Sequence, residues 1–140
     1  MPIQFKLLGY AGLIPFILLP LLAYTEVINY FYSFQHFVQY SAIILSFFGG
    51  IHWYDALQNN RVNHQLYVSM LPSIIAWLSL LILDGNMLLG VLSCTFIGTL
   101  MYDKYTLVME KAKIIAYTKL RLILTTVVVL CHLCMAVIAA

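Results

Sequence analysis

His52 and Asp55 are the two ionisable side chains whose spacing most directly suggests chemistry. They lie three residues apart in an apolar stretch, so on a helix they share one face. A carboxylate beside an imidazole fixes the tautomer of the ring and raises its basicity. Ionisable groups are costly inside a membrane-spanning segment, and each one there is a functional hypothesis.

Asp103 and Arg121 are the second pair, because each lies at one end of an apolar segment. An arginine can bind a carboxylate or a phosphate through two parallel hydrogen bonds. We expect Asp103 and Arg121 to form a polar cluster with His52, Asp55 and the neighbouring Trp53. Such a cluster suits an anionic head group, a quinone ring or a proton. The alternative is that these groups satisfy one another and fix the ends of helices.

Soft metal ligands occur in the string Cys131-His-Leu-Cys-Met135. One helix rarely completes a metal site, and Cys and Met are also common apolar fillers. A haem held by His52 and His132 is disfavoured because their depths differ by roughly 10 Å at 1.5 Å per residue. We therefore expect neither a metal nor another cofactor. The sequence has no phosphate-binding loop, nucleophile elbow or zinc-protease helix, so it indicates no enzyme class.

The amino-acid composition indicates whether the protein that carries these residues is soluble or embedded in a membrane. The chain has 140 residues, of which 64% are hydrophobic and 9% charged. Soluble domains carry about 25% charged residues. Only a surface in contact with lipid tails needs so little polar cover. The few basic residues lie between apolar stretches, which disfavours nucleic acid as a partner.

Five segments are long and apolar enough to cross a hydrocarbon core of about 30 Å. We therefore expect a single all-α membrane domain over residues 1–140, folded as a compact bundle of five transmembrane helices. The expected spans are about 5–24, 37–57, 66–83, 87–102 and 120–140.

The basic residues predict the orientation of the bundle. With five spans, all 7 lysines and arginines fall on one side, at positions 6, 61, 104, 111, 113, 119 and 121. Short loops rich in lysine and arginine stay in the cytoplasm. The N-terminus is therefore predicted to be cytoplasmic and the C-terminus outside.

Apolar and lysine-bearing faces alternate at helical spacing over about 105–118, which predicts a short amphipathic helix at the cytoplasmic interface.

Small residues recur where helices could pack closely. Gly49 and Gly50 lie on the second expected span, and Gly90 and Gly98 lie on the fourth with Cys94 between them. Helices in membranes associate through such small-residue faces. We expect these glycines to contact other helices, although glycine is also common in apolar helices without such a role.

A longer pattern resembles a known family. The string Ser46-Phe-Phe-Gly-Gly-Ile-His-Trp53 looks like the signature of the domain-of-unknown-function family 3429, the relatives of mitochondrial transmembrane protein 69. Three more stretches resemble it: residues 9–16, residues 71–77 and the start of the last span at Leu120. The chain departs from the family pattern at Ala116, where a tryptophan is expected. The resemblance implies a bacterial inner membrane, or a mitochondrial one in a eukaryote, and no biochemical activity.

Two functions remain open. The first is an accessory, scaffold or assembly-type protein that acts through protein partners or membrane lipid, with a homo-oligomer as one form. The second is a small binding or transport protein for a lipid, a quinone or a proton, which uses the polar cluster around His52 and Arg121. A cavity that reaches His52 favours the second function, and a sealed bundle favours the first.

Overall fold

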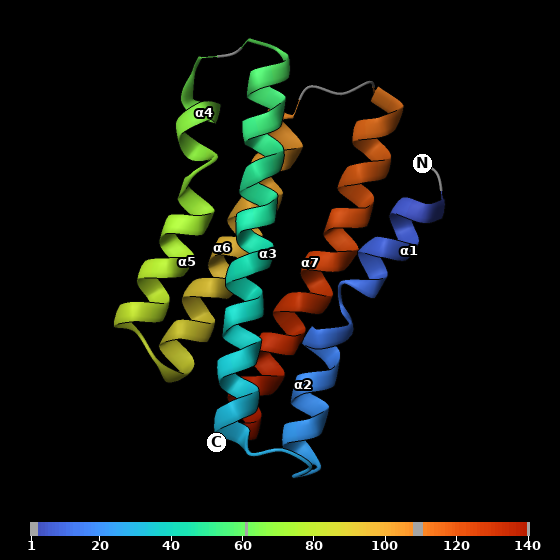
Figure 1. Ribbon diagram of the computed structural model, residues 1–140. Coiled ribbons are helices and arrows are strands. Elements are labelled where there is room, and N and C mark those ends of the chain that lie inside the picture. Colours follow the sequence, from blue (N-terminus) through green and yellow to red (C-terminus); the bar gives the residue numbers. More distant parts are fainter. Residues whose placement is uncertain (1–2, 61, 108–110, 140) are drawn as a thin grey trace.

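The computed structural model describes residues 3–60, 62–107 and 111–139, and in these ranges it is helical with short connecting turns. The all-helical prediction is confirmed. Figure 1 shows the order of the helices, which are α1 (Ile3–Ala11), α2 (Ile14–Tyr24), α3 (Tyr30–Gln58), α4 (His64–Val68), α5 (Leu71–Ile82), α6 (Gly85–Thr106) and α7 (Lys111–Ala139).

Within the described residues, 4 stretches are long and apolar enough to cross a membrane: Ile3–Tyr24, His64–Ile82, Gly85–Thr106 and Lys111–Ile138. The chain is therefore a multi-pass membrane protein. Helix α3 has 29 residues, but its composition does not place it among these four.

Two of the expected spans are each broken into two helices. Leu13 precedes Pro15 at the break between α1 and α2, and Met70 precedes Pro72 at the break between α4 and α5. Proline cannot donate its backbone nitrogen to the preceding turn. At the first break the Tyr40 hydroxyl donates to the Gly12 carbonyl oxygen at 2.8 Å, which satisfies an acceptor that the interrupted helix exposes.

The ends of α3 and α7 differ most from the expected spans. α3 begins at Tyr30, seven residues before the expected start, and Asn29 caps it by accepting from the Phe31 backbone nitrogen at 2.8 Å. The separate helix expected over 105–118 is wrong: residues 105 and 106 belong to α6, and residues 111–118 are the first turns of α7. No proline or glycine interrupts the chain from Lys111 to Ala139, so the helix runs on. Residues 108–110 of this prediction lie outside the described residues.

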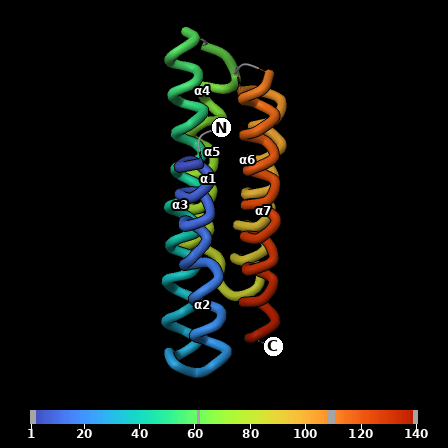
Figure 2. Tube along the Cα trace, turned by 90° about the vertical axis from the view of Figure 1, so that its right-hand side faces the viewer, coloured from blue at the N-terminus to red at the C-terminus, as the bar shows by residue number. Residues whose placement is uncertain are grey.

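The long helices pack side by side (Figures 1 and 2). α3 contacts α2, α5 and α6, while α7 contacts α2 and α6, so these five helices surround one apolar core. The most buried core side chains are Phe16, Phe37, Leu45, Leu92, Phe96 and Met135. In Figure 1 the end of α3, α4, the end of α6 and the start of α7 all lie at the top of the bundle.

Candidate functional site

Three helices bury polar residues on the same stripes that build the core. On α3 the buried stripe passes Phe37, Ser41, Leu45, Gly49, His52 and Asp55. On α6 it passes Leu92, Phe96, Thr99 and Asp103. On α7 it passes Arg121, Thr125, Val128, His132 and Met135. Spacings of three and four keep each stripe on one helical face, so core packing carries the charged residues inward.

Asp103 is the centre of the polar cluster. Arg121 Nε donates to Asp103 Oδ2 at 2.7 Å, and His52 Nε2 contacts Asp103 Oδ1. The three side chains are almost completely buried. The structure therefore brings together three of the residues predicted for this site, from α3, α6 and α7.

Gln65 connects the fourth predicted residue, Asp55, to the cluster. Its amide nitrogen donates to Asp55 Oδ2 at 2.9 Å and lies 3.1 Å from His52 Nδ1. An amide group has two hydrogens to donate and no acceptor on its nitrogen. His52 Nδ1 is therefore the acceptor, and Nε2 carries the proton toward Asp103. A single hydrogen-bonded network thus joins α3, α4, α6 and α7.

Arg121 has two further contacts that explain how a cation can be buried here. Its guanidinium carbon lies 3.6 Å from the centre of the Phe48 ring, and Nη1 donates to the Thr125 hydroxyl at 3.3 Å. Cation–π contact is worth more where water is excluded. Arg121 Nη2 has no hydrogen-bond partner among the described residues. The residue was expected at the mouth of the last span, but it lies ten residues after Lys111, about 15 Å inside α7.

Trp53 is the predicted site residue that the structure does not bring into the cluster, because its side chain is 49% exposed on α3.

Conversely, sequence reasoning missed Gln65, Phe48 and Thr125. The signal for Gln65 is Asn63, whose side chain caps α4 by accepting from the Gln65 backbone nitrogen at 3.0 Å. A capping asparagine indicates that a helix starts directly after it, which places Gln65 in the first turn of α4 and not in a loop.

The four glycines predicted to pack against helices behave differently. Gly49 is buried, and a Cβ atom there would overlap the carbonyl oxygen of Ser69, at the break between α4 and α5. For Gly50, Gly90 and Gly98 a Cβ atom would meet nothing within 4 Å. Against the described chain, these three glycines therefore do not pack as expected.

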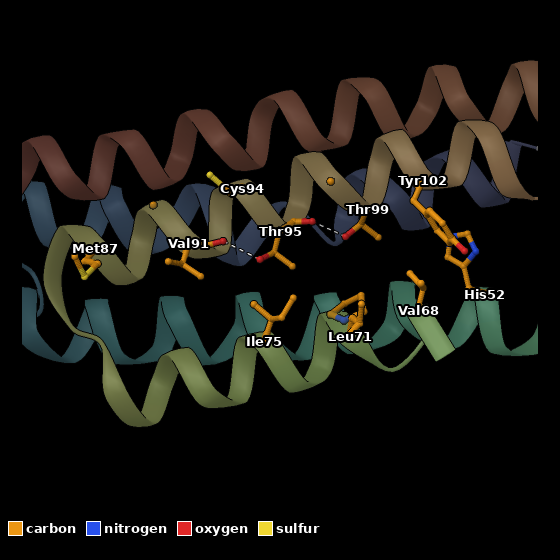
Figure 3. Close-up of a pocket in the computed structure, with 13 residues that line it drawn as sticks. His52, Val68, Leu71, Ile75, Met87, Val91, Cys94, Thr95, Thr99 and Tyr102 are labelled. Carbon is orange, nitrogen blue, oxygen red and sulfur yellow. Dashed lines mark hydrogen bonds between the residues drawn. The ribbon is translucent and has the colours of Figure 1, made fainter. Parts of the chain in front are cut away.

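Gly90 and Gly98 instead line a groove along α6 and the facing part of α4 and α5 (Figure 3). Its volume is about 680 Å³, and its lining includes Cys94, Ile75, Tyr102 and His52. The groove runs from Met87 to the polar cluster, which it meets at the His52 ring.

The hydroxyls on the groove wall are turned back to their own helix. Thr95 Oγ1 donates to the Val91 carbonyl at 2.8 Å, and Thr99 Oγ1 donates to the Thr95 carbonyl at 2.5 Å (dashed in Figure 3). At the polar end, the Tyr102 hydroxyl lies 2.6 Å from His64 Nδ1. Hydroxyls bonded in this way present their carbon atoms, so most of the wall is apolar.

His132 belongs to a separate buried pair, deeper in the bundle. Its Nδ1 donates to the Val128 carbonyl at 2.8 Å, and Nε2 lies 3.0 Å from Ser41 Oγ. The Phe37 ring lies edge-on to it, with centroids 4.6 Å apart. Among the described side chains, no three His, Cys, Asp or Glu residues gather as a metal site. Nδ1 thus fixes the ring against its own helix, and the contact of Nε2 with Ser41 joins α7 to α3.

Comparison with known proteins identifies relatives. A family model described as "Protein of unknown function (DUF3429)" matches residues 1–137. Transmembrane protein 69 of Xenopus tropicalis is 37% identical over 128 residues, which cover 87% of this chain and 49% of that protein. The chain thus spans about half the length of this relative. No solved structure matches.

Proposed function

Because this chain belongs to the DUF3429 family of membrane proteins of unknown function, we propose a role that needs no catalysis: an accessory protein that binds membrane lipid. The binding site is the groove along α6, and its occupant is the hydrocarbon chain of a membrane amphiphile. The observation that carries the proposal is that this groove reaches the buried His52 ring.

The position and size of the groove support a hydrocarbon occupant. Its walls come from two stretches that are apolar enough to cross a membrane, so it opens sideways toward lipid tails. Its volume of about 680 Å³ lies within the range of about 300–1,000 Å³ that is typical of small-molecule sites. Gly90 and Gly98 provide the space, because any larger side chain would project into the groove.

The polar cluster supports an accessory role rather than chemistry on a substrate. Both ring nitrogens of His52 and both carboxylate oxygens of Asp103 contact other protein groups. Internal pairing is the usual fate of charges inside membrane helices. The cluster thus fixes α3 and α6 relative to one another at the end of the groove.

The proposal includes a location and an orientation. α3 is the fifth span, since 29 helical residues extend about 43 Å, more than the roughly 30 Å required. The N-terminus is cytoplasmic and the C-terminus outside, because this orientation keeps the basic residues in the cytoplasm. The membrane is a bacterial inner membrane, or a mitochondrial inner membrane in a eukaryote, as the family resemblance implies.

Photo-crosslinking tests the groove. The full chain is reconstituted in a bilayer that contains a phospholipid with a diazirine on one acyl chain, and adducts are mapped by mass spectrometry. We expect adducts to concentrate on groove residues such as Ile75 and Val91. Gly98→Leu should reduce them about tenfold, which corresponds to 1.4 kcal/mol.

Gly50→Leu is the matched control, because Gly50 is also a helical glycine with open space around it, but it does not line the groove. It should leave the adducts unchanged. Even labelling of all exposed apolar faces, insensitive to Gly98→Leu, would contradict the proposal. So would a dimer that dissociates in Gly98→Leu, because a second copy of the chain would then be the occupant.

A further inference from the structure

We infer that the occupant of the groove is a polyisoprenoid with a neutral ring-shaped head, of the quinone class, and not a phospholipid. This inference rests on the proposed function and identifies the ligand of the same site. Two features of the groove carry it: its length along α6 and the uncharged, aromatic character of its polar end.

The groove is longer than one leaflet of a bilayer. Its lining on α6 runs without a gap through each turn from Met87 to Tyr102. These residues are fifteen positions apart, or about 22 Å at 1.5 Å per residue. Half of a hydrocarbon core of about 30 Å is only about 15 Å. An acyl chain anchored in one leaflet therefore fills part of the groove, whereas a long isoprenoid tail fills all of it.

The polar end of the groove suits a neutral flat ring. Of the described residues that line the groove, none is a lysine or an arginine, so nothing there complements a phosphate. The Tyr102 and His52 rings lie at this end with centroids 4.9 Å apart. Aromatic faces favour offset stacking with another ring. The exposed His64 imidazole, whose Nδ1 contacts the Tyr102 hydroxyl, adds a second ring nitrogen that can donate a hydrogen bond to a ring carbonyl.

Competition against the photoreactive phospholipid tests the inference. Three unlabelled competitors are added to the reconstituted full chain: a quinone with a long isoprenoid tail, the same quinone ring with a single isoprene unit, and phosphatidylethanolamine. We expect the long-tailed quinone to reduce groove adducts at about tenfold lower mole fraction than either other competitor, a difference of 1.4 kcal/mol. Gly98→Leu should abolish this preference, and Gly50→Leu should retain it.

Each other outcome is decisive. If phosphatidylethanolamine competes as well as the long-tailed quinone, the quinone inference is overturned and the lipid-binding function stands. If the short-tailed quinone competes equally well, the length argument fails and the inference with it. If neither the photoreactive phospholipid nor a photoreactive long-tailed quinone labels the groove, the proposed function fails too. Gly90→Leu replaces Gly98→Leu if that variant does not fold, because a Cβ atom at Gly90 also meets open space.

Discussion

Asp103 is the residue on which the buried charges of this molecule depend. It accepts from Arg121 and contacts His52, and both partners are almost fully enclosed by the bundle. A buried ion pair contributes little when it is compared with a well-packed apolar pair, but the loss of one partner leaves an uncompensated charge. The asymmetry makes single substitutions here more damaging than double ones.

Arg121→Leu should therefore lower the free energy of unfolding in mild detergent by about 3–5 kcal/mol, since Asp103 would be left buried without its cation. The double variant Asp103→Leu, Arg121→Leu should be more stable than Arg121→Leu alone. Both are measured by thermal or denaturant unfolding of the purified full chain.

Lys113→Leu is the control for this experiment, because Lys113 is an exposed cation near the start of the same helix. It should change the free energy of unfolding by no more than about 0.5 kcal/mol. Equal stabilities of Arg121→Leu and Lys113→Leu would show that the buried pair does not stabilise the bundle.

The charged residues of this cluster could be predicted from the sequence, and the reason is physical. Charges in apolar segments are costly, so His52, Asp103 and Arg121 were expected to seek one another. Gln65 carries no charge and stood in an expected loop, so no cost argument identified it. The exposure of Trp53 was equally out of reach, because adjacent residues on a helix point in different directions and only packing decides which one is buried.

At the scale of elements, the backbone of α3 comes very close to the chain at the break between α4 and α5. Gly49 faces the Ser69 carbonyl there without room for a side chain. Ser69 Oγ itself donates to the Leu66 carbonyl at 2.6 Å, which holds the last turn of α4. The helix break therefore depends on a glycine of another helix.

Gly49→Ala should destabilise the protein by about 1–3 kcal/mol, the usual cost of overpacking. Gly50→Ala, one position along, should be neutral or stabilising by up to about 1 kcal/mol, because alanine is the better helix former and meets no neighbour. The two melting temperatures, measured in the same detergent, check this opposite behaviour. A stable Gly49→Ala variant would mean that α3 and α5 are further apart than the structure has them.

The boundaries of the elements were less predictable than their existence. Hydropathy located the apolar segments, but it says nothing about whether a proline only bends a helix or breaks it, as at Pro15 and Pro72. The amphipathic pattern near Lys113 was also real, yet the backbone continues as one helix with the last span. Periodicity gives the face of a helix and not its ends.

At the scale of the whole molecule, the proposed orientation can be tested with one matched pair of cysteines. Asn59 and Asn86 are both exposed, just beyond the end of α3 and in the first turn of α6. In a full chain whose native cysteines are replaced, a membrane-impermeant maleimide should label Asn86→Cys in intact cells. It should label Asn59→Cys only after the membrane is opened, because the proposed orientation puts the two positions on opposite sides. Labelling of both from outside would exclude the five-span arrangement.

The membrane class followed from composition, because a chain with 9% charged residues cannot cover a surface in water. The helices followed from the length of the apolar segments. The groove could not be predicted in the same way. The spacing of Gly90 and Gly98 on one helical face suggested close packing against another helix. The same spacing can instead leave a groove open beside the helix, as it does here. Only the positions of the neighbouring helices distinguish the two.

The sideways opening that we propose for the groove has a consequence for how the affinity of a lipid occupant should be expressed. An occupant that enters between α5 and α6 never leaves the hydrocarbon phase, so no transfer from water contributes to the free energy of binding. The free energy of binding is then the difference between the packing of the occupant against the groove wall and its packing against other lipid chains. Occupancy depends on the mole fraction of the amphiphile among all lipids, and arrival depends on diffusion in two dimensions. A dissociation constant in molar units therefore does not describe this site.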